Sequence, residues 1–185
     1  DYIKFSSDIH ESVPLSGSSK DAVKSYTGQT YQEINRVLRG VKQYGEVSSK
    51  ARNILDALDE AFVNDGVYLD GFKRSVFRGQ SVSADMIDDI IETKKYRTNS
   101  FYSTSTNLSV AFSFLKYQNN LSDEGDTIKT PSKGRVANLM SISDLHRIPV
   151  IVPGNYSEFQ GECEIILPRG TDLYLSNWEI IEKPI

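Results

Sequence analysis

The period of the hydrophobic pattern changes near Gly66, and this change restricts the possible folds more than any other feature of the sequence. Before Gly66, apolar residues recur at the spacing of one helix face, most regularly over residues 49–62. After it, short apolar runs alternate with Gly, Pro and Asn, a pattern typical of strands and turns. Helices that are followed by strands predict an α+β domain and argue against a doubly wound α/β fold.

Three helices are expected in the first third of the chain, over residues 18–26, 31–39 and 49–62. The second is expected to begin in a capping box, because Thr30 and Glu33 have the T-x-x-E spacing in which each side chain bonds the other's backbone N–H. The third helix should bury one apolar face, made of Ala51, Ile54, Leu55, Leu58, Ala61 and Phe62.

The rest of the chain predicts strands at 67–69, 75–77, 101–106, 135–142, 148–152, 163–167 and 172–181. Residues 84–91 are expected to form a helix whose inward face holds Met86, Ile87, Ile90 and Ile91. A further helix is expected over 108–117, with Asn107 as its N-cap. Residues 118–134 are rich in polar and turn-forming residues and predict a loop or an insertion.

The composition fits one domain that spans residues 1–185, in which the polar residues 1–17 form an irregular lead-in. Hydrophobic residues make up 38% of the chain, enough for a sizeable core. The net charge of −4 and the pI near 5.3 argue against a nucleic-acid partner, which requires a basic face. No apolar run approaches the roughly 20 residues that span a bilayer. One Cys and two His are too few for a disulfide framework or a Cys/His metal site, so no metal is expected.

Two short segments carry residues suited to binding an anion and orienting a carboxylate. Arg78 stands at the end of a predicted strand, where its guanidinium could bind a phosphate, and Gly79 would let a ligand approach the backbone closely. In the strand predicted at 101–106, Ser103 and Ser105 share one face, where their hydroxyls could orient a carboxylate. Taken alone, each segment has an ordinary alternative: a surface arginine before a turn, and an edge strand that faces water.

The third segment holds a pair of acids. If 163–167 is a strand, Glu162 and Glu164 project on one face, roughly 6.5–7 Å apart at a rise of about 3.3 Å per residue. Two such carboxylates repel, which raises the pKa of at least one of them. A carboxylate pair in unequal surroundings could stabilise a sugar oxocarbenium ion and handle a nucleophile. The alternative is a solvated strand face beside a turn.

The order and spacing of Arg78, Ser103-Thr104-Ser105 and Glu162-x-Glu164 resemble the signature of the R-S-E class of bacterial mono-ADP-ribosyltransferase toxins, which includes the enzymatic components of actin-modifying binary toxins. Residues 26–39 resemble the family's first NAD-binding helix, and residues 153–161 resemble its substrate-recognition loop. The resemblance covers essentially the whole chain. It implies an α+β domain in which two packed, roughly perpendicular β-sheets form an NAD cleft with flanking helices.

The resemblance also implies a set of NAD-binding residues: Arg78, Gly79, Tyr31, Asn35, Ser103, Thr104, Ser105, Phe114 and Glu164. Arg78 would bind NAD near its phosphates and the nicotinamide ribose, and the backbone of Gly79 would hold the nicotinamide amide. Tyr31 and Asn35, at i and i+4, would face the cofactor. Phe114, or Phe112 in its place, would stack on the nicotinamide side. The alternative for Phe114 is a core aromatic on its helix.

The implied catalytic residues are Glu164, Glu162, Ser103 and Arg78. Ser103 would orient Glu164, while Thr104 and Ser105 shape the strand. The Glu164 carboxylate would bond the 2′-hydroxyl of the nicotinamide ribose and stabilise the oxocarbenium ion as nicotinamide leaves. Glu162 would position an acceptor arginine and help to remove its proton.

Two loop aromatics, Tyr156 and Phe159, are implied together with Glu162 in recognition of the target protein. The alternative for each aromatic is that it packs down and braces the loop.

The function implied by the resemblance is that of a secreted toxin, a monomer that acts in the host cytosol. It would transfer ADP-ribose from NAD to an arginine of a host protein and release nicotinamide. Actin and small GTPases are both compatible targets. Two alternatives stay open: an NAD glycohydrolase that uses water as the acceptor, and a non-catalytic module that only binds NAD.

Overall fold

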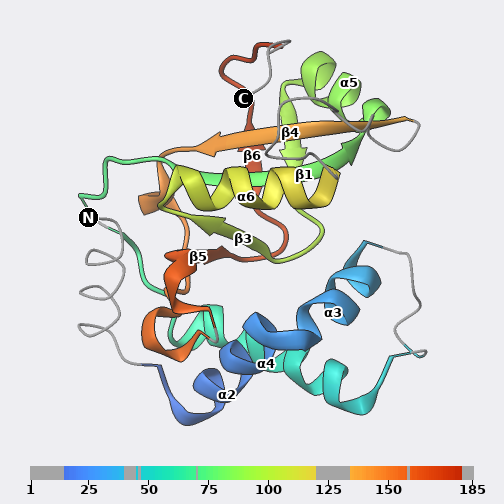
Figure 1. Ribbon diagram of the computed structural model, residues 1–185. Helices are drawn as coiled ribbons and strands as arrows, with labels where there is room; N and C mark the ends of the chain where they lie inside the picture. The colour runs from blue at the N-terminus through green and yellow to red at the C-terminus, as the bar shows by residue number, and fades with distance from the viewer. Residues whose placement is uncertain are drawn as a thin grey trace.

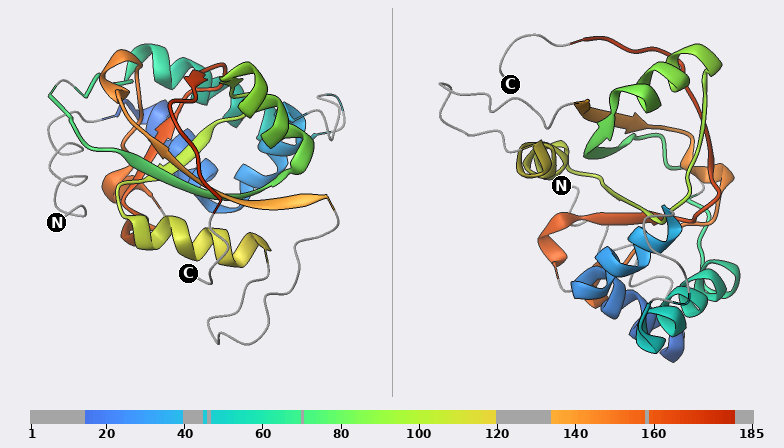
Figure 2. Two further views of the ribbon diagram at one scale, coloured as in Figure 1. Left: turned by 90° about the horizontal axis from the view of Figure 1, so that it is seen from above. Right: turned by 90° about the vertical axis from the view of Figure 1, so that its right-hand side faces the viewer.

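The computed structural model describes residues 15–39, 45, 47–69, 71–119, 134–157 and 159–180. Its first helices gather at one end of the molecule, and the strands with the two later helices make up the rest (Figures 1 and 2). This arrangement of helices and two antiparallel sheets confirms the predicted α+β class. Within the described ranges, no helix has the length and apolar character needed to cross a membrane.

Within the described residues the first helix, α2 (Gly17–Ser25), continues through a π-helical turn, η1 (Tyr26–Thr30), into α3 (Tyr31–Leu38). Only Gly28 leaves the helical region, with ψ at −127°, and it kinks the segment. The predicted capping box is wrong. Thr30 is itself helical and makes no capping bond. The carboxylate of Glu33 instead accepts bonds from the backbone N–H of Ser48 at 3.0 Å and from its hydroxyl at 3.2 Å.

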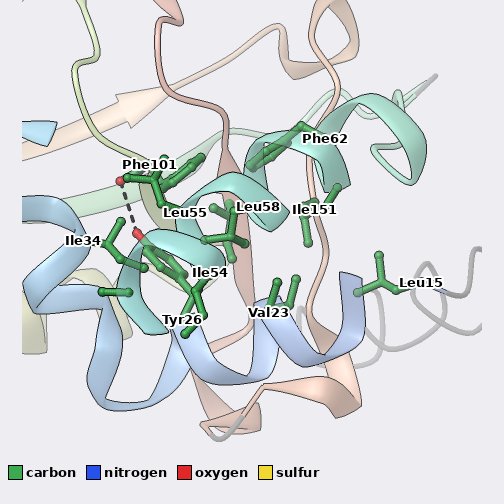
Figure 3. Close-up of a cluster of buried hydrophobic side chains, with 14 of the residues drawn as sticks. Leu15, Val23, Tyr26, Ile34, Ile54, Leu55, Leu58, Phe62, Phe101 and Ile151 are labelled. Carbon is green, nitrogen blue, oxygen red and sulfur yellow. Dashed lines mark hydrogen bonds between the residues drawn. The ribbon is translucent and has the colours of Figure 1, made fainter. Parts of the chain in front are cut away.

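Helix α4 (Ser49–Asn64) begins where predicted, because the Ser48 hydroxyl accepts a bond from the Ala51 N–H at 3.1 Å. All six residues of the predicted apolar face are buried, so this prediction is confirmed. They pack in a first hydrophobic cluster around Tyr26 and Phe101, whose ring centroids lie 5.6 Å apart, edge to face (Figure 3). Phe62 stacks on Phe101 from the other side at 5.8 Å.

The larger sheet has four antiparallel strands in the order β4-β1-β3-β5. Strands β1 (Val76–Ser83) and β4 (Arg135–Ile142) pair over their whole lengths. Strands β3 (Tyr102–Ser105) and β5 (Glu164–Leu167) also pair throughout. In contrast, β1 and β3 share only the pair Phe77↔Ser105. The two central strands therefore separate just beyond Phe77, at the position of Arg78.

Alternating side chains of β5 divide the interior into two clusters. Ile166 belongs to the first cluster with the N-terminal helices. Ile165 and Leu167 point the other way, into a second cluster that includes Tyr102 of β3. The smaller sheet, β2 (Lys95–Arg97) with β6 (Asp172–Tyr174), contributes to the second cluster through its central residues Tyr96 and Leu173.

Two helices accompany the strands. Helix α6 (Leu108–Asn119) is capped as predicted, because the Asn107 side-chain oxygen accepts from the Ser109 N–H at 2.9 Å. Helix α5 (Ala84–Thr93) is also present, but its predicted inward residues are only half-buried.

Three predicted strands are reduced in the structure. The segments 67–69 and 148–152 are joined only through the bridge Val67↔Val150, and Ile151 bridges Ile166. Pro149 lies within the segment 148–152 and Pro153 follows it, and neither proline has an N–H to donate to a ladder. The strand predicted at 172–181 ends at Tyr174. The lead-in 1–17 and the loop 118–134 lie largely outside the described residues.

Candidate active site

Arg78 is held at the point where β1 leaves β3. Its Nη1 donates to the backbone oxygen of Ser103 at 2.8 Å, and its Nε donates to the Gln80 side-chain oxygen at 2.9 Å. The guanidinium carbon lies 4.1 Å from the ring centroid of Tyr102, in a cation–π contact. These two bonds use two of the five N–H groups of a guanidinium, so others remain for an anionic ligand.

Gln80 is a buried part of this site to which the sequence assigned no role. Its side-chain oxygen accepts from Arg78 and also from the Tyr102 hydroxyl at 3.2 Å, while its amide nitrogen donates to Asn138 on β4 at 3.1 Å. Gln80 thus fixes the plane of the guanidinium. Strand alternation could have placed it beside Arg78, since residues i and i+2 share a face.

Glu164 is the first residue of β5 and is only 8% exposed. Burial away from water, the largest effect, raises the pKa of its carboxyl to about 7. The Ser103 side chain, within hydrogen-bonding reach, and the charge of Arg78 both lower this pKa, while the negative charge of Glu162 raises it. The Glu164 Oε2 atom is buried and has no hydrogen-bond partner among the described residues, which marks a place for a ligand donor.

Glu162 is half-buried, and burial raises the pKa of its carboxyl. The predicted strand geometry of the two acids is wrong. Glu162 ends a 3-10 turn, η5 (Gln160–Glu162), and β5 begins only at Glu164. The residue between them, Cys163, has a φ of +49°, so regular strand alternation does not relate the two side chains. Glu162 still lies close enough to influence the charge of Glu164.

The expected NAD-binding helix reaches the site through Tyr26, which the sequence did not single out. Asn35 of α3 is buried and donates to the Tyr26 hydroxyl at 3.2 Å, and this hydroxyl lies 3.5 Å from the Phe101 carbonyl oxygen (Figure 3). The Ser103 side chain is also within reach of the Tyr26 hydroxyl, and burial raises the pKa of this phenol to about 12. The Asn35 Oδ1 atom is buried and lacks a hydrogen-bond partner among the described residues. Tyr31, one turn before Asn35, is exposed.

A second cation, Arg39, follows the last residue of α3. The residue is exposed at the surface, but the surrounding protein atoms partly shield its guanidinium from water and lower its pKa, and the like charge of Arg78 lowers it further. Within the described ranges, neither arginine forms an ion pair with a carboxylate. Two neighbouring guanidiniums without acids are suited to a polyanion.

Gly79 packs closely against helix α6. A Cβ at this position would lie 1.9 Å from the Ala111 carbonyl oxygen and 2.8 Å from the Leu115 nitrogen, both in α6. The close approach of α6 therefore requires glycine at this position, and the contact of its backbone with NAD stays a prediction. Phe114 of the same helix is 39% exposed and belongs to neither hydrophobic cluster, so it is not a core aromatic. Phe112 is half-buried.

The two later residues of the Ser-Thr-Ser segment bond to the backbone. The Thr104 hydroxyl donates to the Ile165 carbonyl oxygen at 2.6 Å, and the Ser105 hydroxyl donates to the Glu162 carbonyl oxygen at 2.6 Å. Both residues thus hold the acid-bearing segment against β3, in line with the structural role expected for them.

The two loop aromatics differ in the structure. Tyr156 is half-buried against the first hydrophobic cluster, and Lys20 lies over its ring at 5.1 Å from the centroid. It therefore braces the loop. Phe159 is 55% exposed and remains available for contact with another molecule.

Comparison with known proteins places this geometry in a family. The sequence matches the ADP-ribosyltransferase exoenzyme family over residues 5–184. It is 27% identical over 181 residues to the NAD(+)–arginine ADP-ribosyltransferases of Enterobacteria phages T2 and T6, an alignment that covers 83% of this chain and 26% of theirs. The chain thus spans about a quarter of the length of these curated relatives.

Solved structures share the fold at low sequence identity. The Vis toxin, an ADP-ribosyltransferase of Vibrio splendidus, aligns with a TM-score of 0.67 and 17% identity over 97% of this chain and 78% of its own. An ADP-ribosyltransferase of Clostridium botulinum aligns with a TM-score of 0.64 and 16% identity over 98% of this chain and 88% of its own. Together with the family match, which covers nearly every residue, these findings show that the chain belongs to the ADP-ribosyltransferase exoenzyme family.

Proposed function

We propose that the chain transfers ADP-ribose from NAD to the guanidine of an arginine and releases nicotinamide. The observation that carries this proposal is the convergence on the Glu164 carboxylate of groups far apart in the sequence. The Ser103 side chain, the charge of Arg78 and the charge of Glu162 each act on that carboxylate. The names of the phage relatives and of a Vis structure in complex with agmatine, a guanidine compound, support the choice of acceptor.

The two arginines supply the site for the NAD pyrophosphate. Arg78 is fixed by Gln80 and Tyr102 and keeps donors free, and Arg39 brings a second positive charge close to it. A pyrophosphate between them would replace the repulsion of two cations by two charge-assisted contacts. The nicotinamide ribose would then lie toward Glu164, where Oε2 lacks a donor that a ribose hydroxyl can provide. A structural neighbour, exoenzyme S, is bound to carba-NAD.

Cleavage breaks the bond between the ribose C1′ and the nicotinamide nitrogen, and the bonding electrons leave with nicotinamide. Positive charge develops on the ribose at that moment. An ionised Glu164 in a site poor in water stabilises this charge more in the transition state than in bound NAD, which lowers the barrier. The Ser103 side chain lowers the pKa of this carboxyl and so favours its ionised form, in opposition to burial.

Transfer then needs a guanidine that has lost its proton at the attacking nitrogen. The raised pKa of Glu162 makes this carboxylate a stronger base than a solvated glutamate, and its partial exposure leaves it accessible to a second substrate. The new bond joins the guanidine nitrogen to C1′, and the proton passes to Glu162. No group of three or more potential metal-ligating side chains occurs among the described residues, and this chemistry assigns no step to a metal.

The biological role is proposed from the same features. We infer a secreted, monomeric toxin or effector that modifies a host protein, with actin and small GTPases as compatible targets. The exposed side chain of Phe159 beside η5 provides a contact for that protein close to Glu162. Incubation of host lysate with biotinylated NAD, followed by mass spectrometry, would identify the target and the acceptor residue.

The activity itself is tested with NAD and agmatine. The wild-type chain should release nicotinamide and form ADP-ribosyl-agmatine, and Glu164→Gln should abolish both products. Nicotinamide release with free ADP-ribose as the only partner product would favour the glycohydrolase. NAD binding in calorimetry with no turnover would favour the non-catalytic module, and no binding at all would refute every one of these functions.

A further inference from the structure

The backbone between the two glutamates adopts an unfavourable conformation. Cys163 has a φ of +49°, in the left-handed region that side chains other than glycine rarely occupy. Lys94 and Asp144 also have positive φ among the described residues, but both are exposed. Cys163 is only 2% exposed. A buried residue in this region is retained only where its surroundings enforce it.

Hydrogen bonds from the end of β3 hold Cys163 in this conformation. The Ser105 hydroxyl donates to the Glu162 carbonyl oxygen at 2.6 Å, and the Thr106 N–H donates to the Cys163 carbonyl oxygen at 3.1 Å. The Ser105 oxygen also accepts from the Asn107 N–H at 2.9 Å, so its own proton is left for Glu162. Two successive carbonyl groups around the left-handed residue are thus fixed by two successive residues of β3 and its end.

The two serines of the Ser-Thr-Ser segment therefore act on different glutamates. Ser103 acts on the side chain of Glu164, the acid assigned to NAD cleavage. Ser105 instead acts on the main chain of Glu162, the acid assigned to the acceptor. Because Glu162 precedes β5 and ends the turn η5, its direction depends on this attachment and on the left-handed Cys163, not on strand pairing.

We propose that Ser105 and Cys163 are positioning residues that aim the Glu162 carboxylate at the acceptor guanidine and so favour transfer to arginine over transfer to water. This proposal rests on the proposed transferase function and adds to it the residues that set the choice of acceptor. Neither side chain is required to touch NAD or the guanidine. The Cys163 thiol itself has no chemical part.

The test separates the two products of one reaction. Purified protein is incubated with NAD and agmatine, and ADP-ribosyl-agmatine and free ADP-ribose are quantified by mass spectrometry. In Ser105→Ala, loss of one buried hydrogen bond should lower agmatine transfer about fivefold to tenfold. NAD hydrolysis without agmatine should fall by a smaller factor, so that the ratio of transfer to hydrolysis drops, and a wild-type circular dichroism spectrum would show that the variant is folded.

The matched control is Ser100→Ala. Ser100 is a buried serine close in sequence whose hydroxyl has no partner among the described residues, so its removal breaks no hydrogen bond there. Both activities should be unchanged in this variant. The comparison distinguishes the bond to Glu162 from the general effect of removing a buried hydroxyl.

A second pair of variants tests the backbone conformation. Cys163→Ala removes the thiol but keeps a residue that can take the left-handed form at similar cost, and the ratio of transfer to hydrolysis should be unchanged. Cys163→Val adds a branched Cβ, which disfavours that form strongly, and should lower the ratio as Ser105→Ala does. This pair keeps the proposal testable if one variant fails to fold.

The outcomes distinguish this proposal from the function on which it rests. Equal losses of transfer and hydrolysis in Ser105→Ala, or no loss of transfer, would overturn the positioning role while the wild-type activity still supports the transferase. A low ratio in Cys163→Ala would overturn the conformational argument in favour of the thiol. A wild-type chain that cleaves no NAD would overturn both proposals together.

Discussion

Replacement of Glu164 by glutamine should stabilise the fold in alkaline solution and leave it nearly unchanged in acid. Glutamine has the shape of a protonated glutamate and carries no charge at any pH. In the folded chain the pKa of Glu164 is raised from its ordinary value of 4.5 to about 7, chiefly because the carboxyl is buried. A rise of this size corresponds to a cost of about 3 kcal/mol for keeping the ionised form in the folded state.

The direction in which the free energy of unfolding changes with pH follows from proton binding. Between pH 4.5 and about 7 the folded chain holds a proton on Glu164 that the unfolded chain has already lost. The free energy of unfolding therefore falls as the pH rises through this window, and the loss is complete above it. In Glu164→Gln this contribution is absent. The difference in unfolding free energy between variant and wild type should grow from near zero at pH 4.5 to about 3 kcal/mol at pH 8.5.

The assay is urea unfolding of both proteins across this pH range, followed by tryptophan fluorescence or circular dichroism. Titrating groups that do not interact with Glu164 affect both proteins alike and cancel in the difference, and the interaction with Glu162 is a smaller effect than burial. In thermal melts the same effect corresponds to a higher midpoint by roughly 6–12 °C for a domain of this size at pH 8.5. A difference that is constant with pH, or that is larger in acid, would refute the assignment of Glu164 as a carboxyl that burial makes costly to ionise.

Three further predictions concern rate, packing and surface charge. The kcat/KM of NAD cleavage should rise with pH with a midpoint near 7, because only ionised Glu164 stabilises the ribose cation; a profile that is flat from pH 6 to 8 would contradict this role. Gly79→Ala should lower the unfolding free energy by about 3 kcal/mol, since its Cβ would overlap the Ala111 carbonyl oxygen in α6. Arg169→Ala should cost less than about 1 kcal/mol although its Nε donates to Asp59 at 2.9 Å, because the side chain of Arg169 is exposed and that of Asp59 is partly exposed.

Controls for the last two predictions are available in the chain. A Cβ at Gly17 would meet no atom within 4 Å, so Gly17→Ala should be neutral or slightly stabilising in the same urea titration. If both alanine variants lose equal stability, the explanation by contact with α6 is wrong. For Arg169, the loss should shrink further in 1 M NaCl, whose Debye length is about 3 Å; a loss that is independent of salt would point to packing instead of charge.

Local patterns were sufficient to predict the parts of the fold that depend on neighbours in the sequence. The buried face of α4 follows from helical spacing, and its start follows from the Ser48 cap. The start of α6 follows in the same way from Asn107. Strand β4 has its predicted bounds, 135–142. In each case one element alone determines the outcome, so the sequence carries the necessary information.

The errors occurred where a distant segment decides the local structure. Thr30 and Glu33 match the sequence pattern of a capping box. However, the chain enters α3 from an existing helical turn, and the Glu33 side chain accepts a hydrogen bond from Ser48 instead. The packing of Gly79 against α6, more than thirty residues later, was likewise not predicted. Neither contact can be seen in a window of a few residues.

The two acids of the candidate site show why a motif can select residues and still mispredict their geometry. Residue spacing drew attention to Glu162 and Glu164, whose charges interact. Their relative direction depends on a left-handed Cys163, a residue type with no preference for that conformation. Hydrogen bonds from Ser105 and Thr106, almost sixty residues earlier, supply what the local sequence lacks. The geometry of the acceptor side is therefore a property of β3 as much as of the segment that carries the glutamates.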